Sequence, residues 1–98
     1  MKRGEVYWAT LTPRSGSEQA GRRSVIVVPV STSASQARRG PTAVALPAGA
    51  GGLAQESVAL CHQVTTLDRA KLAALLGSLT IAHLREVEEG LRIALGMV

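Results

Sequence analysis

The segment 16–23 has the residue types and spacing needed to hold a phosphate group. Gly16 and Gly21 enclose a serine, a carboxylate and an amide, and Arg22 and Arg23 close the segment. Glycines adopt the positive-φ conformations of tight turns at little cost, so the segment can expose its backbone amides. Guanidinium groups present fixed pairs of N–H donors that suit phosphate oxygens better than a lysine ammonium does. This pattern predicts a loop that binds a polyanion, although a solvated hairpin loop would have a similar composition.

A second polar segment, residues 31–41, is rich in hydroxyl groups and contains Arg38 and Arg39. A helix over 33–39 is conceivable, but Gly40-Pro41 would stop it and the serines compete for backbone hydrogen bonds. Gln63 lies near the end of a later apolar run, where it could face a ligand. These residues are the remaining candidates for a polar binding site.

The charge distribution favours a polyanionic partner. The chain has 98 residues and a net charge of +4. Residues 1–50 hold seven Lys or Arg against two acids, whereas residues 51–98 hold four against five. A basic half joined to a nearly neutral half indicates a polyanion-binding surface, although basic surfaces without such a partner also occur.

Metal, disulfide and membrane functions are not expected. Cys61 is the single cysteine and lies in an apolar run, where a buried small hydrophobe is expected rather than a reactive thiol. Only two histidines accompany it, so we expect no metal site and no cofactor. No apolar run reaches the length of about 18 residues that a membrane span needs, and the first residues lack a signal-peptide core. We therefore expect a cytoplasmic protein without membrane contact.

The elements that must position these residues read as strands followed by helices. Strands are expected over 5–11, 25–28, 42–46 and 57–64, with Pro29 ending or bulging the second. The glycine-rich stretch 47–52 reads as a flexible turn without the spacing of a nucleotide-binding P-loop.

Two helices are expected near the C-terminus. Asp68 would cap the first, which Gly77 would end. The second starts at Thr80 and has an apolar stripe, while Gly90 weakens it by about 1 kcal/mol relative to alanine. The stripe contains Ile81, Leu84, Val87, Leu91 and Leu95. Without βαβ alternation, this order predicts an antiparallel α+β domain, a small curled sheet with helices packed at one side.

Several blocks of the chain resemble the MazF/PemK family of toxin endoribonucleases. The most specific block is Gly16-Ser17-Glu18-Gln19-Ala20-Gly21-Arg22-Arg23, and the others are residues 1–8, 28–33, Gln63-Val64 with Asp68, and 91–96. The blocks occur in the family's order and span most of the chain. The resemblance implies a single MazF-like toxin domain over residues 1–98, with an SH3-like barrel of the CcdB/MazF type and flanking and C-terminal helices. It also implies a homodimer, metal-free cleavage of single-stranded RNA and neutralisation by a cognate, MazE-like antitoxin.

The resemblance assigns roles to particular residues. Arg23 matches the essential arginine of the family, and Glu18 matches its acidic neighbour. The catalytic hydroxyl is Ser31 by alignment or Thr32 by residue type. Positions that line the RNA groove are matched by Ser17, Gln19, Arg22, Ser33 and Gln63.

Two departures from the family pattern affect this assignment. Ser24 stands where the family usually has proline. The run 25–28 leads directly into Pro29, whereas family members usually hold a polar loop and a further strand there. The fold would then lack one family strand, unless a segment is missing or the alignment differs at this point. Eight residues in one extended strand span roughly 26 Å, so joining Arg23 to Ser31 would need a sharp bend or the other subunit.

The chemistry implied by this resemblance needs no external nucleophile. The 2′-hydroxyl attacks the adjacent phosphorus and leaves a 2′,3′-cyclic phosphate and a 5′-hydroxyl end. Arg23 would stabilise the phosphorane, and Glu18 would either act as the base or orient the arginines. With only Tyr7 and Trp8 as aromatic residues, base edges and phosphates would carry more of the binding than stacking does.

Two other classes of function remain open at the level of sequence. One is a non-enzymatic gyrase inhibitor resembling CcdB, which shares the expected fold. The other is a catalytically inactive relative that binds RNA or antitoxin.

Overall fold

The computed structural model describes residues 1–11 and 24–97, and the described part is an α+β fold built from short strands, 3₁₀ turns and one α-helix at the C-terminal end. The strands are β1 (Glu5–Ala9), β2 (Ser24–Val27), β3 (Val30–Ser31), β4 (Ala43–Leu46), β5 (Ser57–Leu60), β6 (Thr65–Asp68) and β7 (Leu72–Ser78). The 3₁₀ turns are η2 (Ala34–Arg39), η3 (Ala50–Gly52), η4 (Cys61–Gln63) and η5 (Arg69–Lys71), and the helix is α1 (Ile81–Ala94).

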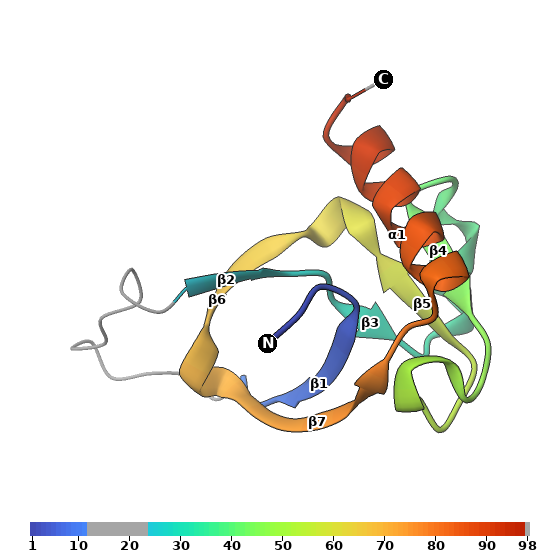
Figure 1. Cartoon of the computed structure of the whole chain (residues 1–98). Coiled ribbons are helices and arrows are strands. Elements are labelled where there is room, and N and C mark those ends of the chain that lie inside the picture. The colour runs from blue at the N-terminus through green and yellow to red at the C-terminus, as the bar shows by residue number, and fades with distance from the viewer. Residues whose placement is uncertain (12–23, 98) are drawn as a thin grey trace.

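All strand pairings among the described residues are antiparallel. β1 pairs with β7, β2 pairs with β6, and β5 lies between β3 and β4. Figure 1 shows β1, β7, β6 and β2 curving around one side of the molecule, while α1 lies along the side formed by β4 and β5. The fold class expected from the sequence, a curled antiparallel sheet with a C-terminal helix, is confirmed.

The run from Ser24 to Ser31 forms two strands, so the expectation that it serves as a single strand is wrong, whereas the expected end of the first strand near Pro29 is confirmed. β2 ends at Val27 and β3 begins at Val30, and the two strands belong to different sheets. Pro29 explains the break because it has no N–H to donate to a ladder. Its carbonyl still accepts a hydrogen bond of 2.8 Å from the Leu60 amide, so contact with the partner segment continues across the break.

β2 and β3 nevertheless run along the same partner segment, which consists of β5, η4 and β6. Ser24 lies opposite Asp68, and Ser31 lies opposite Val58. Between the two pairings the partner segment holds three more residues than the β2–β3 segment, and this excess forms the η4 turn. The strand expected over 57–64 therefore ends at Leu60, and Gln63 lies in a bulge rather than in a strand.

The prediction of a first helix that begins after Asp68 is wrong. Asp68 does cap a turn, because its side chain accepts a hydrogen bond from the Ala70 amide, but the turn is the three-residue η5. The following residues form β7, the longest strand described. Its leucines and alanines favour a helix by propensity, but the pleated edge of β1 needs a partner and tertiary pairing overrides that weak preference.

The second expected helix is confirmed as α1. The Thr80 hydroxyl caps it by accepting a hydrogen bond from the His83 amide. The predicted apolar stripe is only partly covered: Val87 is buried, whereas Ile81 and Leu95 are 71% and 59% exposed. Packing against the sheet is therefore concentrated at the middle of the helix.

The core lies between α1 and the sheet of β3, β4 and β5. Cys61 has no solvent exposure and packs with Leu46, Ala59 and Val87, as expected for a small buried hydrophobe. Burial raises the pKa of its thiol, which keeps the sulfur protonated.

The turn over 47–52, which was expected to be flexible, is packed against the sheet. A Cβ on Gly51 would lie 2.5 Å from the Val6 side chain, and one on Gly52 would collide with the backbone carbonyl of Leu76. Both glycines have positive φ. Because glycine has no Cβ, η3 lies closer to β1 and β7 than it could with any other residue at these two positions.

Candidate active site

The residues on either side of the arginine-bearing segment 12–23 are held at the η5 turn. At its N-terminal end, the Thr10 amide donates to the Lys71 carbonyl at 2.8 Å. At its C-terminal end, Ser24 pairs with Asp68. The predicted site residues of the loop lie outside the described residues; they are Ser17, Glu18, Gln19, Arg22 and Arg23. The exposed Arg69 of η5 lies between the two anchors and adds a basic group there.

The predicted hydroxyl groups lie at the end of β3. Ser31 is half-buried, and its Oγ accepts a hydrogen bond of 3.0 Å from the Ser33 amide. Thr32 and Ser33 are exposed, and the Ser33 hydroxyl lies 2.9 Å from that of Ser35. Ser31 is therefore held by a local turn and can still donate its own proton, whereas no bond to another described residue orients the Thr32 hydroxyl.

Gln63 is exposed at the end of η4. The turn is fixed from inside by Cys61, whose amide donates to the Thr42 carbonyl at 2.9 Å and whose sulfur donates to the Val87 carbonyl at 3.5 Å. Burying Cys61 turns the next two side chains of η4 toward solvent. Gln63 thus has the exposure that a ligand contact requires.

The structure separates the anchor of the arginine loop from the hydroxyl segment. Ser24, the residue after Arg23, pairs with Asp68 in one sheet, and Ser31 pairs with Val58 in another, ten positions away along the β5–β6 segment. Both strands pair antiparallel with their partners, β2 with β6 and β3 with β5. Gln63 lies in η4, between the partner residues Val58 and Asp68. The described pairings join Ser24 and Ser31 to different partner residues and not to each other.

His62 is a candidate that the sequence interpretation missed by placing it in a strand. It lies in η4, is exposed, and has its Nδ1 atom 3.5 Å from the hydroxyl of Thr42. In the sequence, only its position beside Gln63 pointed to a role for His62. Thr42 is 20 residues away, and the pairing of β4 with β5 brings it close.

A second polar group outside the predicted site joins the N-terminus to β1. A carboxylate oxygen of Glu5 accepts hydrogen bonds from the Lys2 amide at 2.7 Å and from the Tyr7 hydroxyl at 2.9 Å. The Lys2 bond, followed by the Tyr7 bond, lowers the pKa of Glu5. The bond to Glu5 raises the pKa of Tyr7, while the charge of Arg69 acts in the opposite direction. The described contacts are those of a structural clamp.

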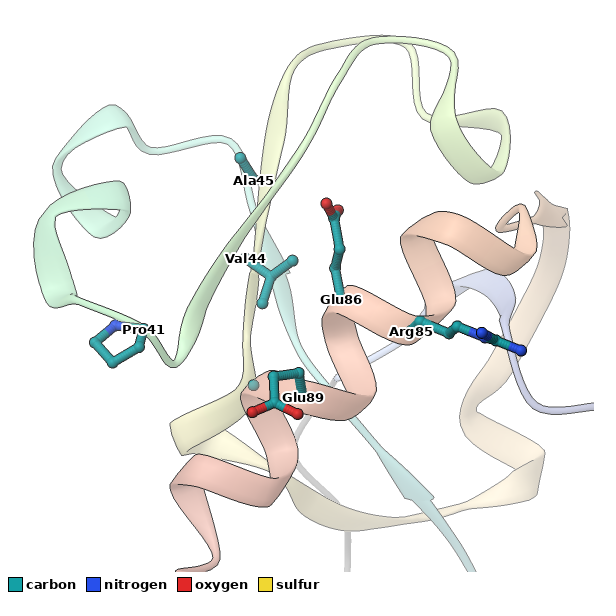
Figure 2. Close-up of a pocket in the computed structure, with 7 residues that line it drawn as sticks. Pro41, Val44, Ala45, Arg85, Glu86 and Glu89 are labelled. Carbon is teal, nitrogen blue, oxygen red and sulfur yellow. The ribbon is translucent and has the colours of Figure 1, made fainter. Parts of the chain in front are cut away.

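Two cavities lie beside α1, and none of the described candidates Ser31, Thr32, Ser33 and Gln63 lines them. An open hollow of about 470 Å³ lies between α1 and β4, lined by Val44, Arg85, Glu86 and Glu89 among others (Figure 2). A second, mainly apolar cavity of about 540 Å³ lies between α1, β2 and the first four residues. The Arg3–Glu88 ion pair of 3.3 Å joins two of the residues that line the second cavity.

The part of the chain that the structure describes contains no group of three His, Cys, Asp or Glu side chains arranged to hold a metal ion. None of its helices is long and apolar enough to cross a membrane.

A family model identifies the class of protein to which this fold and these residues correspond. The model for the PemK-like, MazF-like toxin of type II toxin–antitoxin systems matches residues 2–95. The chain therefore belongs to this family. The matched range includes the arginine-bearing loop and the hydroxyl segment.

The comparisons with individual proteins agree with this class. The chain is 33% identical to Endoribonuclease EndoA of Bacillus subtilis, over 100% of this chain and 97% of that protein. It is 32% identical to Endoribonuclease MazF of Staphylococcus saprophyticus, over 99% and 92%. The alignment with EndoA spans 112 positions, more than the 98 residues of this chain, so this chain is shorter in at least one segment.

Solved structures show the same fold. A mycobacterial endoribonuclease in complex with its cognate antitoxin superposes with a TM-score of 0.75 at 25% identity, over 98% of this chain and 95% of that chain. MazF of Deinococcus radiodurans superposes with a TM-score of 0.72 at 26% identity, over 99% and 97%.

The function is that of a MazF-like toxin endoribonuclease of a toxin–antitoxin system. The alternatives of a CcdB-like gyrase inhibitor and of an inactive relative are not favoured, because the curated relatives are endoribonucleases.

Proposed function

We propose that this chain cleaves single-stranded RNA sequence-selectively and without a metal ion, by attack of the 2′-hydroxyl on the adjacent phosphorus. The observation that carries the proposal is the family match over residues 2–95, which includes the glycine-bounded arginine loop. The products are a 2′,3′-cyclic phosphate and a 5′-hydroxyl end. The reaction consumes no water, so the protein has only to move protons and stabilise charge.

Arg23 stabilises the dianionic phosphorane in this proposal, since a guanidinium group donates two parallel hydrogen bonds to phosphate oxygens. Glu18 either removes the 2′-hydroxyl proton or pairs with an arginine and orients the loop. Ser31 or Thr32 donates a hydrogen bond to the phosphate. The groove that holds the flanking nucleotides is lined by Ser17, Gln19, Arg22, Ser33 and Gln63.

The choice between the two hydroxyls is supported by their different surroundings. Ser31 is oriented by the bond that it accepts from the Ser33 amide, whereas Thr32 is exposed. A preoriented donor stabilises a developing charge better than a mobile one. We therefore assign the phosphate contact to Ser31, and cleavage by Ser31→Ala compared with Thr32→Val tests this assignment.

A homodimer fits the distribution of apolar side chains and the spacing of the site. Trp8, Ile26, Leu75 and Ile81 are large and more than half exposed, which is typical of surfaces that are covered by association. A second subunit can also bring the hydroxyl segment of one chain toward the arginine segment of the other. The molar mass in solution, measured by light scattering, tests this proposal.

We propose a cognate, MazE-like antitoxin as the protein partner and the cytoplasm, where mRNA is translated, as the location. A mycobacterial structural neighbour is in complex with its cognate antitoxin. An acidic, partly disordered segment of an antitoxin would compete with RNA for the basic first half of this chain. One toxin domain spans residues 1–98 in this proposal.

Cleavage of a long mixed-sequence RNA in EDTA, followed by mapping of the cut ends, tests the enzymatic proposal. We expect a small set of related cut sites with cyclic phosphate and 5′-hydroxyl ends, and a loss of cleavage of at least 100-fold in Arg23→Ala. Arg92→Ala is the matched control, because Arg92 is an exposed arginine on α1 that pairs with Glu89 at 3.7 Å. Absence of cuts in EDTA, or cuts that survive Arg23→Ala, would contradict the proposal.

A further inference from the structure

We infer that the outer edge of β4 is a docking site for an extended segment of the antitoxin, which adds a strand to the sheet and places a basic side chain beside Glu86. This inference concerns the partner named in the proposed function and rests on it. It starts from the position of β4 in its sheet. β5 lies along one edge of β4, and no strand of the described residues lies along the other.

The hydrogen-bonding groups of β4 alternate between the two edges of the strand. The Cys61 amide, just after β5, donates to the Thr42 carbonyl at 2.9 Å. Val44 lies opposite Ala59, two residues further along the same antiparallel register, so Val44 bonds to β5 in the same way. The N–H and C=O groups of Ala45 therefore point away from β5.

Ala45 offers a backbone donor and a backbone acceptor at this outer edge. The residue is exposed, and neither group bonds to a described residue outside the β4–β5 ladder. The other outward-facing residue is Ala43, whose amide already donates to the Gly40 carbonyl at 3.0 Å. An extended peptide that pairs antiparallel with Ala45 would satisfy both of its groups, which is the binding mode of strand addition.

The hollow of about 470 Å³ beside α1 lies along this edge and gives an added strand room. Its lining comes from β4 and the turn before it, and from positions of α1 that are one helical turn apart and share a flank of the helix. The lining residues are Pro41, Val44, Ala45, Arg85, Glu86, Glu89 and Gly90 (Figure 2). The edge of β4 and the flank of α1 thus form the two walls of one binding groove.

The charge of this groove favours a basic side chain on the added strand. Glu89 is paired with Arg92 at 3.7 Å, whereas Glu86 forms no ion pair with a described residue. Figure 2 shows the Glu86 side chain extending from α1 beside Val44, while Arg85 points away from β4. A lysine or arginine on the added strand would therefore meet a carboxylate of opposite charge.

The same carboxylate argues against a second copy of this chain at the edge. Pairing two β4 strands about a two-fold axis at Ala45 would place the two Glu86 side chains on either side of that axis, where like charges repel. An antitoxin segment has its own sequence and is free of this constraint. A partly disordered segment can also become ordered as it pairs with an edge.

The position of the groove gives this contact a role distinct from competition with RNA. None of the described residues that we propose to contact RNA lines the groove; they are Ser31, Thr32, Ser33 and Gln63. A strand bound along β4 therefore anchors the antitoxin, while another of its segments competes for the basic half of the toxin.

Amide hydrogen exchange of the full-length toxin, measured with and without its cognate antitoxin, tests the inference directly. The Ala45 amide should exchange rapidly in the free toxin and at least about 100-fold more slowly in the complex. The Val44 amide is the matched control, because it bonds to β5 in both states and its protection should change much less. An unchanged Ala45 amide in a stable complex would overturn the inference.

Substitutions at the edge give a second measurement by titration calorimetry. Ala45→Pro removes the outward N–H, which a solvent-facing edge position can lose, and should weaken antitoxin binding by at least about 10-fold. Ala45→Val keeps the N–H and should bind like wild type. Glu86→Lys should weaken binding by about 3- to 10-fold, whereas Glu56→Lys makes the same charge change at an exposed position outside the groove and should not.

The outcomes separate this inference from the proposed function. Wild-type affinity in a folded Ala45→Pro variant overturns the docking site and leaves RNA cleavage and the antitoxin in place. Protection of the Ala45 amide that rises with the concentration of free toxin identifies a second copy as the occupant and also overturns it. Wild-type toxin that binds no cognate antitoxin overturns the proposed partner and this inference together. If melting shows that Ala45→Pro does not fold, the exchange of the wild-type Ala45 amide and the affinity of Glu86→Lys decide the question.

Discussion

Gly90 of α1 lies so close to Cys61 of η4 that a Cβ atom on the glycine would come within 2.8 Å of the sulfur and within 2.9 Å of the Val44 side chain. The glycine that weakens the isolated helix is therefore the residue that lets the helix approach the sheet. The same contact holds the turn on which His62 and Gln63 are exposed.

Gly90→Ala should destabilise the fold although alanine is the better helix former. Overpacking costs about 1–3 kcal/mol, which outweighs the gain of about 1 kcal/mol in helix propensity. Thermal unfolding should show a melting temperature lower by several degrees, since about 1 kcal/mol corresponds to roughly 4–8 °C in a domain of this size.

Cys61→Ala supplies the control for this prediction. It removes one of the two groups that the new methyl would meet, so the double variant should be more stable than the sum of the single effects predicts. Additive effects would show that Gly90 and Cys61 do not share a packing constraint.

Gly52→Ala should prevent stable folding, whereas Gly49→Ala should be tolerated. Both glycines have positive φ, of 80° and 93°, so both variants carry the strain of about 1–2 kcal/mol that an L-residue has there. Only at Gly52 does the added Cβ meet backbone, the carbonyl of Leu76; at Gly49 nothing lies within 4 Å. Urea unfolding of the two variants measures the difference, and equal stabilities would contradict the close approach of η3 to β7.

The Glu5 clamp should contribute stability at neutral pH and lose it in acid. The folded-state pKa of Glu5 is lowered, first by the hydrogen bond from the Lys2 amide and then by that from Tyr7. The contribution is therefore fully present above the unfolded-state pKa, near 4.5, and disappears as the pH falls through the lower folded-state value. The gap in melting temperature between wild type and Glu5→Gln should close below about pH 4.

The alkaline side of the same clamp gives an independent check. The pKa of Tyr7 is raised by its bond to Glu5, so its contribution is present below the ordinary value of 10.0 and is lost as the pH rises through the folded-state value. Tyr7→Phe should remove this alkaline dependence. Glu56→Gln, at an exposed position, controls for the loss of a carboxylate, and a similar pH profile in that variant would argue against a specific clamp.

Thr80→Ala should destabilise α1 by about 1 kcal/mol, because the Thr80 hydroxyl accepts the otherwise unpaired His83 amide. Thr80→Ser keeps the hydroxyl and should stay close to wild type. Helix content and melting temperature, measured by circular dichroism, report the effect. A serine variant as unstable as the alanine variant would show that the methyl group, and not the cap, matters.

The local features of this protein could be predicted from the sequence wherever neighbouring residues decide the conformation. The start of α1 at Thr80 and the capping role of Asp68 are examples, although Asp68 caps a three-residue turn and not the expected helix. A cap depends on a side chain and on amides two or three residues away. The edge strand β1 and the buried Cys61 were also readable, since β-branched, aromatic and apolar runs have strong preferences. The roles predicted for Arg23, Glu18 and Ser31 came from the resemblance and remain predictions.

What only the tertiary structure decided depends on contacts between residues far apart in the chain. Residues 72–78 are helix formers by propensity and became β7 because β1 offers them a ladder. The break at Pro29 became two strands because β5 and β6 provide separate partners, with η4 absorbing the extra residues. The approach of Thr42 to His62 follows from the pairing of β4 with β5. The local sequence thus determines the caps, the turns and the runs that can form strands. Pairing and packing between distant segments place a histidine and a threonine beside each other.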